Sequence, residues 1–333
     1  MAQPFTAGNF PFPAPGSVSI PSSAPPVCGY VVASYLPHVP VVLNLVALSS
    51  IPKYCPRLAS AFRKWGAWIK AGAEKELAEF YPKDADGATP IAYLWARTIQ
   101  CEGPGCGAEV PLIRSLWLAK KANRSVAFQI VPNKKAKRVD FQIIVKQRGG
   151  WVKQDDHKEK ITDPQFEGAV KRGSATCPCC GYTTPVAQVR EQLKARQGGT
   201  QDGRMFCVIE SRLKEQGRFY RIPTTTDCDA LKKAERQLEK AKREHKGSLS
   251  LVPDEKLDVR GIRHTWAMIY GLDNWGSYFT HRQALTLATL INLVAKVGAQ
   301  LKTSDEEDLA RATQTCLALA VSREADKLSS IAR

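Results

Sequence analysis

The sequence predicts a mixed α+β chain in which a β-rich middle region is flanked by helices. Two observations predict this class. Between Pro56 and Phe80 apolar residues recur every three or four positions, which indicates an amphipathic helix. The β-branched runs Val126–Val131 and Val139–Val145 stand on either side of a basic turn and indicate a β-hairpin.

Length and charge narrow the possible functions. The 333 residues suggest about two domains, and 44% hydrophobic with 24% charged residues is the composition of a globular protein. No run of 18 apolar residues occurs, so we expect no transmembrane helix and no membrane partner. The 48 Lys and Arg against 32 Asp and Glu give a net charge of +16, which favours an anionic partner, with nucleic acid the first candidate.

Four regions follow one another along the chain. Residues 1–50 contain no charged side chain and nine of the 21 prolines, so we expect irregular chain there. Residues 51–85 form a helical connector, and 86–225 form the β-rich domain, with a second strand pair at Arg204–Ser211 and Gly217–Ile222. Residues 226–333 form a helical C-terminal region.

Three helices are expected in that last region. The first, Asp229–Lys246, is highly charged with a thin apolar seam and ends at Gly247. The second opens on a capping box at Thr280 and Gln283 and runs to about Val297. The third opens at Ser304 and runs to about Asp326.

Two cysteine pairs are the sharpest local signal. Cys101 and Cys106 form one pair and Cys177 and Cys180 the other, and a glycine follows the second cysteine of each pair. Four thiolates suit a tetrahedral Zn²⁺, and four protein ligands close its coordination shell, so we expect a structural ion. Cys179 is not expected to be a ligand, because two ligands in one short turn are better separated by two residues than adjacent. Unliganded buried cysteines are the alternative.

The remaining cysteines are scattered along the chain, which indicates ordinary buried thiols and not a disulfide framework. They are Cys28, Cys55, Cys207, Cys228 and Cys316. Metal binding without disulfides points to a reducing, cytoplasmic location.

A basic segment lies between the two cysteine pairs. From Arg114 to Gly150 there are ten basic residues and one acid. We expect this segment to contact the phosphates of a nucleic acid; a soluble hairpin tip is the plainer alternative. The candidate contact residues are Arg114, Lys120, Lys121, Arg124, Lys134, Lys135, Lys137 and Arg138. Trp95, Trp117 and Trp151 are either base-stacking or core residues.

Several segments in the same order and spacing resemble the adenine-specific DNA methylases that contain a zinc ribbon. Beyond the two cysteine pairs, they are Asp86–Thr98, Pro111–Leu118, Val170–Cys177 and Tyr270–Thr280. The resemblance covers about residues 50–325. It implies a Rossmann-like methyltransferase core that binds S-adenosylmethionine, an Asp-Pro-Pro-Tyr motif that holds a flipped adenine, and a zinc ribbon between them.

The sequence departs from this family in two places. Only Pro15–Pro21 stands where the family has its glycine-rich cofactor loop, so Gly16 is the one cofactor-binding residue that carries over. Asp-Pro-Pro-Tyr is missing, since the only Asp-Pro is Asp163-Pro164. We therefore expect a fragment with a remnant of a Rossmann-like start, and no methyl transfer from this chain alone, because the groups that position the adenine are gone.

Two other readings remain open. The chain can be a freestanding zinc-ribbon module that binds nucleic acid, or a scaffold whose C-terminal helices hold a partner subunit. As a fragment, it would have DNA and the missing methyltransferase portion as its partners.

Overall fold

The computed structural model describes residues 46, 50–84, 86–121, 124–213, 215–257, 265–301 and 306–329. The expectations for the first 45 residues, including the cofactor remnant at Gly16 and the thiol of Cys28, lie outside these ranges, as does the helix start at Ser304. Within them the chain is a mixed α+β protein, as predicted. It divides into two compact units, one spanning Glu79–Ala284 and the other joining the helix before Glu79 to the residues from Leu285 onward.

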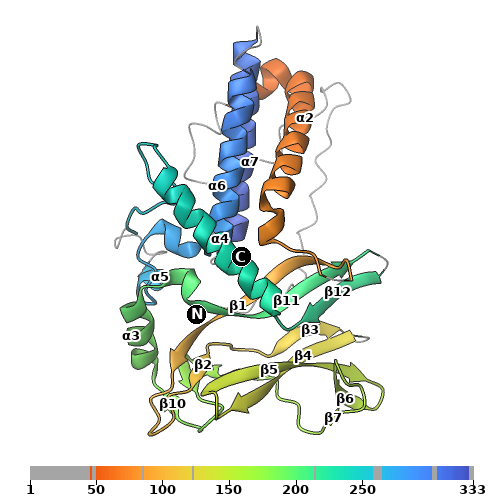
Figure 1. The fold of residues 1–333 in the computed structure, drawn as a ribbon, viewed down its shortest axis with the longest axis vertical. Coiled ribbons are helices and arrows are strands. Elements are labelled where there is room, and N and C mark those ends of the chain that lie inside the picture. Colours follow the sequence, from red (N-terminus) through yellow and green to blue (C-terminus); the bar gives the residue numbers. More distant parts are fainter. Residues whose placement is uncertain are drawn as a thin grey trace, which may run out of the picture. The chain divides into compact units, whose positions relative to one another are not determined.

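A mixed sheet forms the body of the first unit (Figure 1). Its order is β12-β11-β1-β2-β5-β4-β3, with β6 added to β5 and β7 to β6. All neighbouring strands are antiparallel except β2 and β5. The strands are β1 (Thr89–Gln100), β2 (Glu109–Pro111), β3 (Trp117–Lys121), β4 (Arg124–Asn133), β5 (Arg138–Gln147), β6 (Gly150–Lys153), β7 (Lys160–Ile161), β11 (Gly203–Arg212) and β12 (Glu215–Arg221).

The two strand pairs expected from the sequence are present. β4 pairs with β5 from Val126↔Val145 to Asn133↔Arg138, and β11 pairs with β12. Alternate residues of β4 and β5 face the core, which is why Phe128 and Phe141 meet with ring centroids 5.4 Å apart. Phe206 of β11 lies 5.4 Å from Phe128, so strands that are distant in the sheet order share one core.

The sheet curls, because its first and last strands also touch. The Tyr220 hydroxyl on β12 donates to the carbonyl oxygen of Leu118 on β3 at 3.2 Å. The Gln154 side-chain amide donates to the carbonyl oxygen of Tyr220 at 2.8 Å. These bonds satisfy polar groups that an open sheet edge would leave to water.

Smaller elements complete the first unit. A three-stranded sheet has the order β10-β9-β8, formed by β8 (Val170–Lys171), β9 (Ser174–Thr176) and β10 (Thr183–Thr184). The helices are α3 (Val186–Arg196), α4 (Thr225–Glu244) and α5 (Thr265–Met268), with 3₁₀ turns η3 (Gly199–Asp202) and η4 (Trp275–Tyr278).

Helix α4 begins and ends earlier than predicted. It starts at Thr225 because the Thr224 hydroxyl accepts from the Asp227 amide while the Asp227 carboxylate accepts from the Thr224 amide. It ends at Glu244, with His245 in an extended conformation, so Gly247 is not its cap. The thin apolar seam was predicted correctly, since Ala234 and Leu238 are buried while most of the helix is exposed.

The second unit contains α2 (Ile51–Leu77), α6 (His281–Leu301) from Leu285 onward, and α7 (Glu307–Leu328). Helix α2 begins five residues before the predicted start, with Pro56 inside it, and the 3₁₀ turn η2 (Ala78–Phe80) replaces its last predicted residues. Salt bridges join α2 to the other two helices, with Lys53 Nζ 3.2 Å from Asp308 and Lys296 Nζ 3.3 Å from Glu76.

Helix α6 is the most apolar of the long helices that the structure describes. The predicted capping box is present at its start, where Thr280 and Gln283 bond reciprocally. Its length and composition would be enough to cross a membrane, and 50% of its most apolar stretch is buried inside the protein. The core helices of soluble proteins can be equally long and apolar, so the absence of a membrane partner stays a prediction.

Candidate metal centre and basic surfaces

The first cysteine pair lies in the turn between β1 and β2. Cys101 follows the last residue of β1, and its amide donates to the Ala108 carbonyl oxygen at 2.8 Å. The Cys106 amide donates to the Gly103 carbonyl oxygen at 3.0 Å. Gly107 has φ +60°, a left-handed conformation that disfavours side chains, which explains the glycine after the second cysteine.

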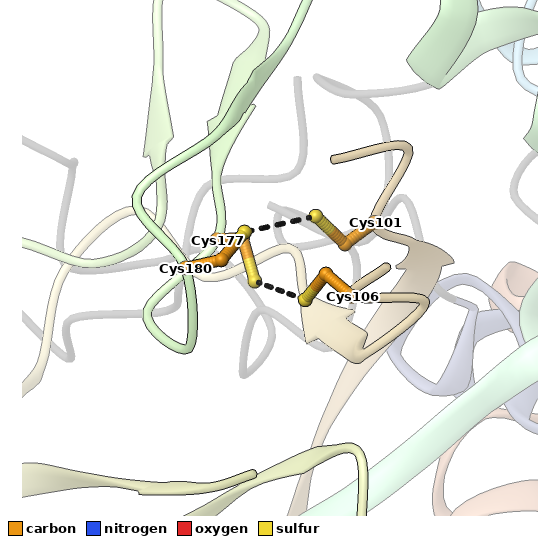
Figure 2. A group of neighbouring side chains, drawn as sticks. All are labelled: Cys101, Cys106, Cys177 and Cys180. Atoms are coloured by element: carbon orange, nitrogen blue, oxygen red, sulfur yellow. Dashed lines mark hydrogen bonds between the residues drawn. The ribbon is translucent and has the colours of Figure 1, made fainter. Parts of the chain in front are cut away.

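The second pair lies in the turn between β9 and β10 and repeats this construction. The Cys177 amide donates to the Tyr182 carbonyl oxygen, and the Gly181 amide donates to the Cys177 carbonyl oxygen, both at 2.8 Å. Gly181 has φ +80°. In both turns a glycine with positive φ follows the second cysteine, and each turn presents two sulfurs on one side (Figure 2).

The two turns meet, and their four sulfurs form one cluster (Figure 2). The Sγ atoms of Cys101, Cys106, Cys177 and Cys180 all lie within 4.8 Å of one another. Cys101 Sγ is 3.5 Å from Cys180 Sγ, and Cys106 Sγ is 3.9 Å from Cys177 Sγ. A tetrahedral ion with metal–sulfur bonds of about 2.3 Å would set its sulfurs roughly 3.8 Å apart. The cluster can therefore hold a metal ion, and four protein ligands would leave such an ion no open coordination position.

Close packing and backbone amides surround the sulfurs. Gly103 lies so near the second turn that a Cβ there would be 2.8 Å from Tyr182 Cβ and 3.1 Å from Cys180 Sγ. The Gly103 amide donates to Cys101 Sγ at 3.3 Å. Burial raises the pKa of the Cys101 and Cys177 thiols, whereas the amide of Tyr182 lowers the pKa of Cys180. Buried thiols ionise at neutral pH when a metal ion binds them.

The other cysteines of the described residues are not part of the cluster. Cys179 is buried in the main core, with its Sγ 3.7 Å from the Arg138 carbonyl oxygen, and it is not one of the four, as predicted. Cys207 is also buried as expected. The expectation was wrong for Cys228, which is exposed because it lies on the solvent side of α4, and Cys55 and Cys316 are only half-buried.

The eight predicted contact residues are all exposed, but they do not form one surface. Lys134, Lys135, Lys137 and Arg138 form the β4–β5 turn, called here the hairpin tip. This tip borders the metal centre, because the Glu109 amide donates to the Lys137 carbonyl oxygen at 2.8 Å and Arg138 contacts Cys179. Lys120, Lys121 and Arg124 lie at the other end of β4, and Arg114 precedes β3.

Two of the three tryptophans, Trp117 on β3 and Trp151 on β6, pack together. Trp117 stacks on Phe166 with centroids 4.4 Å apart and planes 12° apart, and Trp151 lies 5.6 Å from Trp117. All three rings are half-buried. Trp117 and Trp151 therefore pack against Phe166 and each other, with Lys120 Nζ 5.3 Å from the Trp117 ring centroid, while Trp95 lies on β1.

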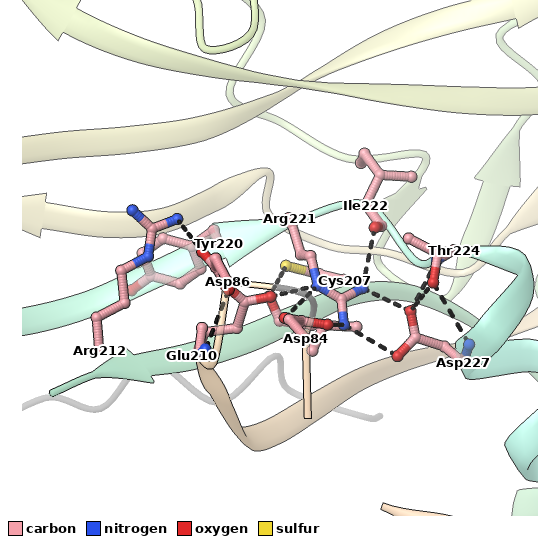
Figure 3. Close-up of polar contacts among 12 residues, drawn as sticks. Asp84, Asp86, Cys207, Glu210, Arg212, Tyr220, Arg221, Ile222, Thr224 and Asp227 are labelled. Carbon is pink, nitrogen blue, oxygen red and sulfur yellow. Dashed lines mark hydrogen bonds and ion pairs between the residues drawn. The ribbon is translucent and has the colours of Figure 1, made fainter. Parts of the chain in front are cut away.

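Sequence reasoning missed a charge network at the junction of β12 and α4 (Figure 3). Arg221 contacts three carboxylates, those of Asp84, Glu210 and Asp227. Burial and the neighbouring Asp84 raise the pKa of Glu210 to about 7. Burial opposes ionisation of Asp227, but hydrogen bonds from Arg221 and Thr224 outweigh it and hold its pKa below the usual value. The spacing of Thr224 and Asp227 is a capping-box signal that would have located this junction.

Comparison of the chain with the profiles of protein families, with characterised proteins and with solved structures gives no match. The metal centre and the basic surfaces therefore rest on the geometry of this chain alone.

Proposed function

We propose that this chain is the zinc-stapled, DNA-contacting region of a DNA methyltransferase specific for the N6 position of adenine, and that it transfers no methyl group by itself. The methyltransferase part of this proposal comes from the sequence resemblance. The metal and DNA parts are supported by one observation, which is that the four-sulfur cluster lies beside the lysine-rich hairpin tip.

The donor set favours zinc. Four thiolates in a tetrahedral arrangement are typical of Zn²⁺ and of iron–sulfur centres, and two short turns joined to small β-strands are the usual setting of a structural zinc. No position stays open for water or substrate once four sulfurs bind. The ion then fixes the shape of the protein and takes no part in a reaction.

The hairpin tip has the charge that phosphate contact requires. Lys134, Lys135 and Lys137 are exposed, and the described part of the chain offers none of them a carboxylate within salt-bridge distance. Arg138 differs, because its Nε lies 2.9 Å from Asp140. Unpaired lysines on a rigid turn can approach DNA phosphates without first breaking internal contacts.

A salt titration tests this role. We would measure binding of a fluorescent 20-base-pair duplex by anisotropy between 50 and 300 mM salt, for the natural chain and for a variant with Lys134, Lys135 and Lys137 changed to Gln. Loss of three phosphate contacts would weaken binding and reduce the slope of log Kd against log salt by up to about 2.7. The matched control changes Lys232, Lys233 and Lys240 on α4 to Gln, which removes the same charge from exposed positions.

Absence of duplex binding by the natural chain would overturn the DNA role. Equal binding by the tip variant and the control would overturn the assignment of the tip. Methyl transfer is checked in the same preparation with duplex DNA and radiolabelled S-adenosylmethionine, where incorporation above background would show that the chain is active alone.

A freestanding nucleic-acid-binding module is the second candidate, because the metal centre and the basic hairpin belong to a single compact unit. The DNA sequence on both sides of the coding region distinguishes a methyltransferase fragment from a freestanding module. A glycine-rich loop and an Asp-Pro-Pro-Tyr motif encoded there in any frame would favour the methyltransferase, and their absence would favour the module.

A further inference from the structure

A second basic site lies at the end of β4 that is opposite the hairpin tip. Here a pocket of about 450 Å³ opens where β4 begins, β5 ends and β12 passes. Its lining contains three cations, Arg124, Lys146 and Arg212, and no carboxylate. The pocket size falls in the range that suits a nucleotide-sized ligand.

Two of these cations are held on one aromatic ring. The guanidinium carbons of Arg124 and Arg212 each lie 4.4 Å from the ring centroid of Phe219. Gly217 leaves room for Arg124, since a Cβ at this glycine would be 2.8 Å from Arg124 Nη1. The ring and the glycine position the two guanidinium groups before any ligand arrives, which lowers the entropic cost of binding.

The positive charge of this pocket is only partly balanced. Within the ranges that the structure describes, Arg124 and Lys146 contact no carboxylate, while Arg212 lies 3.4 Å from Glu215 and 3.8 Å from Asp86. The Nε of Arg212 is buried and has no hydrogen-bond partner among those residues. Cations gathered on one ring repel one another, so an anion between them would stabilise the arrangement.

We propose that this pocket binds a phosphate of a DNA strand. The proposal rests on the DNA-contacting role above and extends it from the hairpin tip to a second place. Arg124 and Lys146 hold the phosphate oxygens, Ser125 and Gln147 supply further hydrogen bonds, and the apolar wall of Val126 accepts the adjoining sugar. Arginine provides the planar pair of donors that phosphate oxygens match.

The two basic sites are separated by the length of β4. Ten residues of extended strand span roughly 30 Å. At about 3.4 Å per base pair, this separation corresponds to roughly nine base pairs of duplex. A duplex must therefore exceed about nine base pairs to reach both sites.

The experiment compares three double or triple variants on duplexes of 6 and 20 base pairs, again by anisotropy across a salt series. The pocket variant changes Arg124 and Lys146 to Gln, the tip variant changes Lys134, Lys135 and Lys137 to Gln, and the control changes Lys232 and Lys233 on α4 to Gln. Because Arg124 packs on Phe219, Lys146→Gln alone is also measured, and all variants are compared by melting temperature.

We expect the pocket variant to bind the 20-base-pair duplex at least tenfold more weakly and to reduce the salt slope by up to about 1.8. Lys146→Gln should give about half that change in slope, and the control none. The tip and pocket variants should affect the long duplex more than the short one, because only the long one reaches both sites.

Three other outcomes would contradict the pocket assignment, the DNA role or the choice of a DNA strand as the ligand. If the natural chain binds the 20-base-pair duplex but both pocket variants match the control, the pocket assignment is wrong and the DNA role stands. If the natural chain binds no duplex, both proposals fall. If the mononucleotide dAMP binds the natural chain as tightly as the duplex does in calorimetry, the pocket serves a free nucleotide and the strand assignment is wrong.

Discussion

Arg221 and Asp227 form a two-bond ion pair, with Nη1 2.5 Å from Oδ2 and Nη2 3.0 Å from Oδ1. The pair joins the last residue of β12 to the first turn of α4, and the same Asp227 carboxylate caps that helix. Arg221 also donates to both oxygens of Asp84, at 2.7 and 3.0 Å. One guanidinium therefore joins a loop, a strand and a helix, and Asp84 in the loop lies 137 positions before Arg221 in sequence.

Replacing Arg221 by Leu should destabilise the first unit strongly. The change leaves Glu210 and Asp227, which are almost fully buried, without their cation. Breaking a buried ion pair by removing one partner costs about 3–5 kcal/mol of unfolding free energy. Urea unfolding of the zinc-loaded chain would measure it. Arg212→Leu is the matched control, because its salt bridges are largely exposed and should contribute less than about 1 kcal/mol; equal losses in the two variants would contradict the prediction.

Glu210 should make stability depend on pH. Its pKa is about 7 in the folded chain, above the usual carboxyl value of about 4.3, so the folded state binds this proton more tightly than the unfolded state. The resulting stabilisation is fully present below the usual value and is lost as the pH rises through about 7. Glu210→Gln removes this proton, so the unfolding free energy of the variant should fall less between pH 5 and 7.5.

The measurement for Glu210 is urea unfolding at several pH values with zinc in excess, since zinc binding to thiolates has its own pH dependence. The quantity compared is the difference between the variant and the natural chain at each pH. A difference that stays constant from pH 5 to 7.5 would show that Glu210 does not titrate there.

Cys180→Ser should abolish tight metal binding, because three sulfurs leave the coordination shell open. We expect one zinc per natural chain and far less in the variant after dialysis, measured by plasma mass spectrometry, with a lower melting temperature. Cys179→Ser is the control, since Cys179 lies in the core near the cluster but outside it. Cys179→Ser should keep its zinc even where the polar hydroxyl lowers stability, and a loss of zinc there would contradict the assignment of the four ligands.

Gly168→Ala should destabilise the first unit, because the new Cβ would lie 2.0 Å from the backbone oxygen of Ile113. The two backbone segments that meet here would have to move apart, which would break hydrogen bonds such as that from the Gly168 amide to the Arg114 carbonyl oxygen at 3.0 Å. Such overpacking costs about 1–3 kcal/mol or more, measurable by urea unfolding. Gly149→Ala has open space around its Cβ and should change stability little; a similar loss in both would show that chain flexibility and not crowding is responsible.

Local patterns in the sequence were enough to locate the metal centre and the two strand pairs. Cysteine spacing and the following glycines determine a turn within a few residues, and β-branched runs determine a strand. The split of the basic residues into two sites was out of reach, because consecutive turns of an antiparallel hairpin series fall at opposite ends of the strands and residues close in sequence move apart. The capping box at Thr224 marks one end of the Arg221 network in the sequence, but the contacts of Arg221 with Asp84 and Glu210 join positions that only the folded sheet brings together.

The order of the ligands along the chain has a consequence for biosynthesis. The four sulfurs belong to turns separated by strands β2 to β9, so the ribosome has to release Cys180 before the coordination shell can close. The first two cysteines are synthesised roughly 70 residues earlier, and two thiolates alone bind a metal ion more weakly than four. Coordination of a metal ion by all four sulfurs is therefore possible only after both turns have been synthesised.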